Sequence, residues 1–267
     1  METRSEWLVA RNSASTGIHS DDFAQRQGFE RAVVAGPNHL SFAATMFEAA
    51  AGPDWLARGR ISARFVAPVY DGEALQVTST PVEGDLQAFA RWETRKRDGA
   101  VAVSGTAGWS PAEEPPHRIR ESSSPAELLD LAGIRPGSRL SESIVVPRED
   151  VVADYCELNH DPFAAPGRVP TAYLTFLLFG PARRFLDHAG VGPGMWGEID
   201  IRQHAPLVAG AGYQYSGLVL SVRRRAALEI IDFAFEARDA TGALACAITH
   251  THLIPHRDSE VAHARPA

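Results

Sequence analysis

One stretch near the N-terminus decides how the rest of the sequence is interpreted, and it reads Gly17-Ile18-His19-Ser20-Asp21-Asp22-Phe23-Ala24. Asp21 and Asp22 stand where the first turn of a helix favours acidic side chains, and Gly28 is placed to end that short helix. His19 therefore precedes a helix and lies in a loop that follows a glycine. A histidine held beside a helix in this way makes the stretch the strongest candidate for a functional site.

A long apolar helix is predicted to follow this loop over residues 40–51. Gly36 is followed by Pro37 and Asn38, and a proline in the first turn with an asparagine nearby is typical of a helix start. The free N–H groups at such a start can hydrogen-bond the carbonyl oxygen of a bound acyl group and stabilise negative charge on it. We therefore expect Gly36, Asn38 and His39 to contact a substrate.

The segments around the loop and the helix follow one another in a recognisable order. They are Ile18 to Asp21, Gly28-Phe29, Val34 to Gly36 and, after the helix, Arg64 to Leu75. This order resembles the MaoC-like hydratase and dehydratase branch of the hotdog superfamily, and the match covers most of residues 7–110. In that family a loop reading Asp, any residue, Asn, Pro, Ile, His supplies an Asp and a His that act together on a thioester-linked acyl chain.

The aspartate of that family motif is missing from this sequence. Counted back from His19 without a gap, its position holds Ala14; with two extra residues in the loop, it holds Asn12. Neither residue can be a general base, because alanine has no acceptor and a carboxamide does not titrate. The resemblance therefore implies His19 as the catalytic, titrating residue, and Asn12 as an amide that orients a water or the substrate. A histidine that caps the Asp21-Asp22 turn and an ordinary turn asparagine are the alternatives.

Composition limits the kinds of partner that the protein can have. The 267 residues are 45% hydrophobic and carry a formal net charge of −7, which suits one large or two smaller cores and disfavours nucleic acid as a partner. No apolar stretch approaches the roughly 20 residues of a membrane span, and the first residues lack the apolar segment of a signal peptide, so we expect a cytoplasmic protein without a membrane partner. Cys156 and Cys246 stand alone in the sequence, and we expect buried free thiols, no metal and no cofactor.

Alternating apolar and polar residues predict strands over 7–10, 60–65, 73–82, 86–95 and 100–109, which with the helix give an α+β fold. Residues 111–137 are rich in proline and serine, and they are predicted to be a linker with a short helix over 126–132.

The second half repeats the first. Ala67 to Gly72 matches Ala205 to Gly210 at an offset of 206 − 68 = 138, and Gly99 to Ala102 matches Gly242 to Ala245 at an offset of 242 − 99 = 143. We interpret the chain as a tandem duplication. The prediction is a tandem (double) hotdog, each repeat a long helix packed on an antiparallel sheet. Its parts are a repeat over 1–110, the linker, a repeat over 138–256 and a disordered tail over 257–267.

The second copy of the motif has lost its histidine. Asp161-Pro162-Phe163 aligns with Asn-Pro-Ile of the family, which puts Asn159 at the Asp position and Ala164 at the His position. We therefore expect the ligand in the first half. The second half, with an apolar helix over 172–179, is expected to supply apolar wall and the Arg183-Arg184 pair for a phosphate group.

Two further polar pairs are expected to be structural. His160 and Asp161 are predicted to lie in a solvated turn. His250 and His252 share one face of the last strand, and a place on the sheet surface is favoured over a role as metal ligands.

The resemblance implies a hydro-lyase that acts on a 2-enoyl or 3-hydroxyacyl group carried on coenzyme A or on an acyl carrier protein. The alternative is a diverged hotdog protein that binds, isomerises or cyclises an acyl or polyketide-like ligand without hydration. A homodimer is left open.

Overall fold

The structure, a computed structural model, describes residues 3–12, 17–26, 28–84, 88–115, 117–159, 161, 167–192 and 194–255. Both predicted long helices form, α2 over Gly36–Ala51 and α5 over Tyr173–His188, and each has 16 residues. The shorter helices are α1 over Asp21–Arg26, α3 over Asp54–Arg58 and α4 over Glu149–Leu158.

The predicted strands of the first half are confirmed, with ends that shift by one or two residues. They are β2 (Leu8–Val9), β3 (Gly59–Phe65), β4 (Ala74–Pro81), β5 (Ala88–Lys96) and β6 (Val101–Trp109). A further short strand that was not predicted, β1, forms over Thr3–Arg4. The second half contributes β7 (Arg139–Val145), β8 (Met195–Gln203), β9 (Tyr213–Arg225), β10 (Leu228–Arg238) and β11 (Leu244–Pro255).

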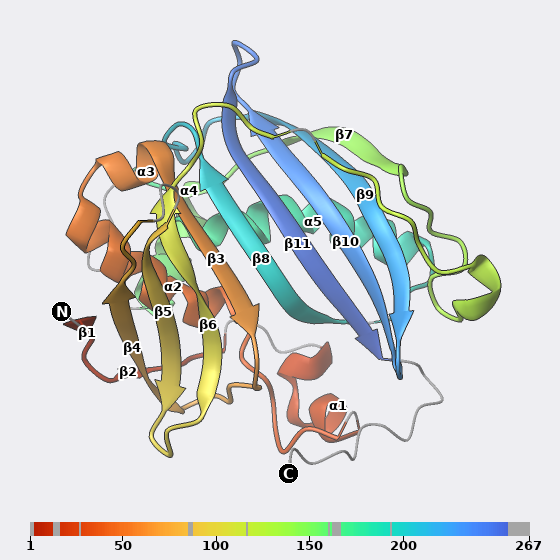
Figure 1. The fold of residues 1–267 in the computed structure, drawn as a ribbon, viewed down its shortest axis with the longest axis horizontal. Helices are drawn as coiled ribbons and strands as arrows, with labels where there is room; N and C mark the ends of the chain where they lie inside the picture. Colours follow the sequence, from red (N-terminus) through yellow and green to blue (C-terminus); the bar gives the residue numbers. More distant parts are fainter. Residues whose placement is uncertain are drawn as a thin grey trace.

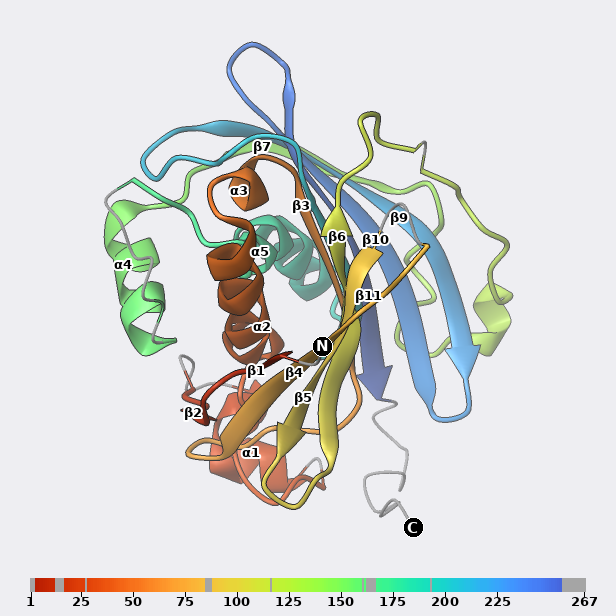
Figure 2. The same ribbon diagram turned by 60° about the vertical axis from the view of Figure 1, so that its left-hand side comes forward.

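All the described strands belong to one antiparallel sheet. Its order is β1-β4-β5-β6-β3-β8-β11-β10-β9-β7, and β2 pairs with β4 beside β1. Figure 1 shows the strands of the two halves side by side, with α2 and α5 together behind the sheet. Turned by 60°, the sheet curves around both helices (Figure 2). The predicted double hotdog arrangement, in which each half packs a long helix on its part of a shared sheet, is confirmed.

The halves meet where β3 pairs with β8. Arg60 lies opposite Arg202, Ser62 opposite Asp200 and Arg64 opposite Glu198. Ser62 and Asp200 differ by 200 − 62 = 138, which is the offset between the two halves of the sequence. Each of the two residues therefore faces its own counterpart, and the approximate twofold relation of the halves runs through this pair.

The connection between the halves, residues 111–137, is not helical where a short helix was predicted. Only a single 3-10 turn, Pro125–Glu127, forms there, and that part of the prediction is wrong. The reason is that the backbone N–H groups of Leu129, Asp130 and Leu131 all donate to the buried carboxylate of Glu229 on β10. These N–H groups therefore bind a side chain from a distant strand, and they are not available for the carbonyl oxygens of a helix.

Candidate functional site

A cavity of about 210 Å³ lies in the first half, where the His19 loop, the start of α2 and the end of β3 meet. Its walls are mostly apolar, and Phe65 from the first half and Trp196 and Leu253 from the second close it. His19 and His39 are the two titratable side chains among its described lining residues. Residues from both halves therefore build a cavity in which two imidazoles meet an apolar space.

His19 is held in place by the backbone around it. It ends a 3-10 turn, Gly17–His19, and its ring Nδ1 lies 2.6 Å from the carbonyl oxygen of Val33. Because a carbonyl oxygen only accepts, Nδ1 must carry the proton, and Nε2 is left as the acceptor nitrogen. The Val33 N–H donates in turn to the carbonyl of Ile18, so the loop and the histidine are fixed to the same residue.

Burial lowers the pKa of His19, and the positive charge of Arg183 on α5 lowers it further, while the hydrogen bond to Val33 acts in the opposite direction. The imidazole is therefore neutral at pH 7, as a general base must be. Arg183 itself is about half exposed and forms an ion pair with Asp187 at 2.8 Å.

Gly36 begins α2 on the wall of the same cavity. A β-carbon added there would lie 2.8 Å from the ring of Phe65 and 3.3 Å from that of Trp196, so only glycine fits without moving an aromatic ring. The Gly36 N–H has no hydrogen-bond acceptor among the described residues, as is usual for the first N–H of a helix. It is available to a ligand.

His39, one turn into α2, is also brought into this cavity. It is 3% exposed, and burial lowers its pKa to about 3. His19, Gly36 and His39 thus lie together, as their positions in the sequence suggested.

The structure places the other predicted site residues outside this cavity. The Asn38 amide donates to the carbonyl of Arg11 at 3.0 Å, and the Asn12 amide donates to the backbone carbonyl of His19 at 3.1 Å. Asn12 and Arg184 line a separate groove of about 850 Å³ between β7, α4 and α5. Asn12 thus supports the histidine loop through its backbone, and the two arginines of the predicted pair lie in different surroundings.

As far as the described residues show, side chains occupy the corresponding place in the second half. Thr171, just before α5, is fully buried, and its hydroxyl accepts hydrogen bonds from Trp55 Nε1 at 2.9 Å and Gln203 Nε2 at 3.1 Å. Gln203 stands where the first half has Phe65, since 203 − 65 = 138. The indole of Trp55, from α3, therefore occupies the second half where the first half keeps a cavity.

Asp161 is not in a solvated turn, and that prediction is wrong. It is 8% exposed and forms ion pairs with Arg168, which also binds Glu48 of α2 at 2.5 Å. The turn is buried because a carboxylate from the other half helps to neutralise the arginine, which could not be read from the local sequence. Its neighbour His160, and Ala164 at the lost histidine position, lie outside the described residues.

The prediction for His250 and His252 is also wrong, because both are buried, at 1% and 2% exposure. Their rings lie 3.3 Å apart between Nε2 and Nδ1, and both pack against Phe179 of α5. Strand alternation puts the two histidines on one face, as predicted, but that face is the one that α5 covers.

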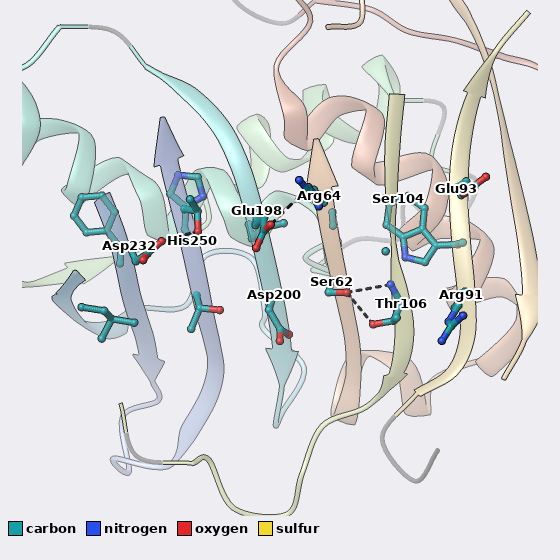
Figure 3. Close-up of a pocket in the computed structure, with 18 of the residues that line it drawn as sticks. Ser62, Arg64, Arg91, Glu93, Ser104, Thr106, Glu198, Asp200, Asp232 and His250 are labelled. Carbon is teal, nitrogen blue, oxygen red and sulfur yellow. Dashed lines mark hydrogen bonds and ion pairs between the residues drawn. The ribbon is translucent and has the colours of Figure 1, made fainter. Parts of the chain in front are cut away.

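The opposite face of the sheet carries a hollow of about 610 Å³ across β3 and β8 (Figure 3). Its side chains are of mixed charge: Arg64 approaches Glu198 at 3.7 Å, and Ser62 hydrogen-bonds Thr106 at 2.8 Å. Asp232 and His250 also line this hollow, so its described lining carries acidic and basic groups together.

Within the described residues no group of three or more His, Cys, Asp or Glu side chains is suited to a metal ion. Among the same residues, no helix has the length and apolar character needed to cross a membrane. Cys156 and Cys246 are buried free thiols, as predicted.

Solved structures share this architecture over almost the whole chain. A MaoC domain dehydratase from Chloroflexus aurantiacus matches at 16% identity, covering 90% of this chain and 87% of that one, with a TM-score of 0.56. A conserved hypothetical protein from Mycobacterium tuberculosis with a double hotdog fold matches at 11% identity, 88% and 86% coverage and a TM-score of 0.57. A protein named an oleoyl thioesterase, from Lactobacillus plantarum, matches at 12% identity, 96% coverage of each chain and a TM-score of 0.53.

The chain therefore has a double hotdog fold. The resemblance to MaoC-like double hotdog proteins that the sequence suggested is confirmed, and at these identities it concerns the fold. No protein-family model and no curated protein matches the sequence.

Proposed function

We propose that this protein is a hydratase or dehydratase of acyl thioesters that uses His19 as its base. The substrate is a 2-enoyl or 3-hydroxyacyl group carried on coenzyme A or on an acyl carrier protein. The observation that carries the proposal is the state of His19: Nδ1 is bound to Val33, the pKa is lowered, and Nε2 is a neutral acceptor at an apolar cavity. Removal of a proton next to a thioester carbonyl needs a base of this kind.

In the dehydration direction, Nε2 of His19 takes the proton from C2 while the C2–C3 double bond forms and the C3–O bond breaks. The imidazolium then gives this proton to the departing hydroxyl, so that water leaves and His19 returns to its neutral state. The Gly36 N–H and the positive end of α2 stabilise the negative charge that develops on the thioester oxygen. Hydration runs through the same steps in reverse.

The carrier of the acyl group bears phosphates, and Arg183 is the residue that we propose to hold one of them. Its charge is near enough to His19 to lower the pKa of that residue, and it is exposed enough to be reached from solvent. Arg184 lies in the separate groove and has no part in this contact.

A second candidate function is supported by one specific observation. The described residues that line the cavity include no carboxylate, and the Asn12 amide is bound to a backbone carbonyl. An isomerase needs only one base, which takes a proton from one carbon and returns it to another, and a binding protein needs none.

The test is an assay with crotonyl-CoA and longer enoyl-CoAs, in which loss of the enoyl absorbance reports hydration. A parallel reaction in D₂O reports exchange at C2 or migration of the double bond, and a thiol reagent reports free coenzyme A. Hydration supports the proposal. Exchange or migration without hydration assigns the second function, and release of coenzyme A alone means thioester hydrolysis and overturns both.

A further inference from the structure

His39 is the polar group of the cavity that the proposed chemistry leaves unused. Its side chain is buried, and neither ring nitrogen has a hydrogen-bond partner among the residues that the structure describes. It packs edge-on against Phe65, with 5.5 Å between the ring centroids, on the wall of the cavity. Burying a polar group without a partner destabilises a fold, and a leucine would fill the same space without that cost. The position therefore indicates that the ligand supplies the missing partner.

The chemistry of the missing partner can be narrowed. The lowered pKa keeps the ring neutral at pH 7, with one nitrogen that donates and one that accepts. A hydroxyl group also both donates and accepts, so it can bond either nitrogen. A charged group would have to be buried against apolar walls, and a saturated alkyl chain would leave both nitrogens unpaired.

The size of the cavity limits the length of the ligand. Its volume of about 210 Å³ is about a quarter of the roughly 850 Å³ of the groove between β7, α4 and α5, so it is much the smaller of the two spaces. Phe65 and Trp196 form part of its wall, and both rings pack closely against Gly36. The acyl portion that fits is therefore short.

We propose that His39 binds the hydroxyl oxygen of a short hydroxyacyl group and thereby selects hydroxyacyl thioesters over saturated ones of the same length. This inference rests on the proposed function and deepens it, because it names the class of substrate that the His19 site takes. His39 acts in it as a specificity-determining residue that touches the substrate, while the proton transfers stay with His19.

The experiment compares the binding of 3-hydroxybutyryl-CoA and butyryl-CoA, which differ in one hydroxyl, by calorimetry. It is done in a His19→Ala background so that turnover does not change the probes. We expect the hydroxylated probe to bind about 10- to 100-fold more tightly, since a buried histidine left unpaired by butyryl-CoA penalises that complex. Octanoyl-CoA should bind more weakly than butyryl-CoA.

Substitution of His39 separates recognition from structure. His39→Leu should remove the preference for the hydroxylated probe while butyryl-CoA binds as before, and its thermal midpoint should not fall. His39→Gln, which keeps a donor and an acceptor, should retain part of the preference and covers the case in which the leucine variant does not fold.

Two results overturn the inference: equal binding of the two probes to the parent protein, or an unchanged preference in His39→Leu. The enoyl-CoA assay remains independent of both. If the protein hydrates enoyl-CoA but shows no preference for 3-hydroxybutyryl-CoA, only the inference about His39 is wrong. If it shows that preference but no hydration, only the proposed function is wrong.

Discussion

The two halves of this protein share a fold but treat the start of the long helix in opposite ways. In the first half Gly36, Phe65 and Trp196 line a cavity, and His19 and His39 line it with them. In the second half Thr171, Gln203 and Trp55 fill the corresponding space and hydrogen-bond one another. The difference shows that one repeat can keep a cavity while its counterpart supplies packed, hydrogen-bonded side chains and part of the cavity wall.

Substitution of His19, in the first half, should cause the largest loss of activity. His19→Ala should reduce enoyl-CoA hydration by about 100- to 10,000-fold, the range of a general base. The thermal midpoint should change little, because the variant loses one hydrogen bond at a partly buried position. Steady-state kinetics and thermal unfolding of the same preparations check both statements.

Asn159→Ala is the matched control, since Asn159 occupies the Asp position of the second motif and caps α4 through a bond to the Tyr155 carbonyl. It should leave turnover intact and cost about 1 kcal/mol of stability. Should Asn159→Ala remove activity while His19→Ala has no effect, the working site lies in the second half.

Two substitutions with smaller expected effects compare the cavity of the first half with the corresponding packed region of the second half. Gly36→Ala should push the new methyl group against Phe65 and lower turnover by about 10- to 100-fold through displacement of the ligand. Thr171→Val should cost about 1–3 kcal/mol of unfolding free energy, because Trp55 Nε1 loses its acceptor, with turnover per folded molecule unchanged. Denaturant unfolding and kinetics on both variants measure the contrast, and equal losses of activity would remove the functional difference between the halves.

The smallest effect concerns the pH at which His19 titrates. Its pKa is lowered in the folded protein, so turnover should fall only when the pH drops below the ordinary histidine range, where the base becomes protonated. Arg183→Gln removes a positive charge that lowers this pKa, so the acidic limb should move to higher pH. Turnover at pH 6, measured at saturating substrate so that weaker phosphate binding does not contribute, should fall by about two- to threefold. NMR titration of the His19 ring checks the direction; no movement would mean that Arg183 does not face the site. Arg184→Gln, in the separate groove, is the control.

The sequence was sufficient to predict the double hotdog, the two long helices and the strands of the first half. The helices and strands follow from local periodicity and the duplication from a repeated offset, which a single chain displays directly. The hotdog arrangement itself was implied by the resemblance to the MaoC-like branch. The sequence also placed His19, Gly36 and His39 close together, because the loop and the helix start adjoin in the chain.

What the sequence did not reveal depends on contacts between distant segments. Phe65, Trp196 and Leu253 close the cavity from three strands, and nothing in their local patterns marks them. Burial of the His250 and His252 pair required knowing which face of β11 α5 covers. Burial of Asp161 depends on Arg168, which forms ion pairs with both Asp161 and Glu48. Glu48 belongs to the other half, so this contact could not be predicted from the local sequence.

The pairing of Ser62 with Asp200 at the centre of the sheet has a consequence for how such a molecule could arise. If two separate copies of the second half met at this position, Asp200 would face a second Asp200, and like charges directly opposite in a sheet are destabilising. Joined in one chain, the halves no longer need to be self-complementary: Asp200 faces a serine and forms an ion pair with Arg60 at 2.6 Å. The central seam is therefore built from two unlike edges, and the edge of the second half is not suited to pairing with a copy of itself.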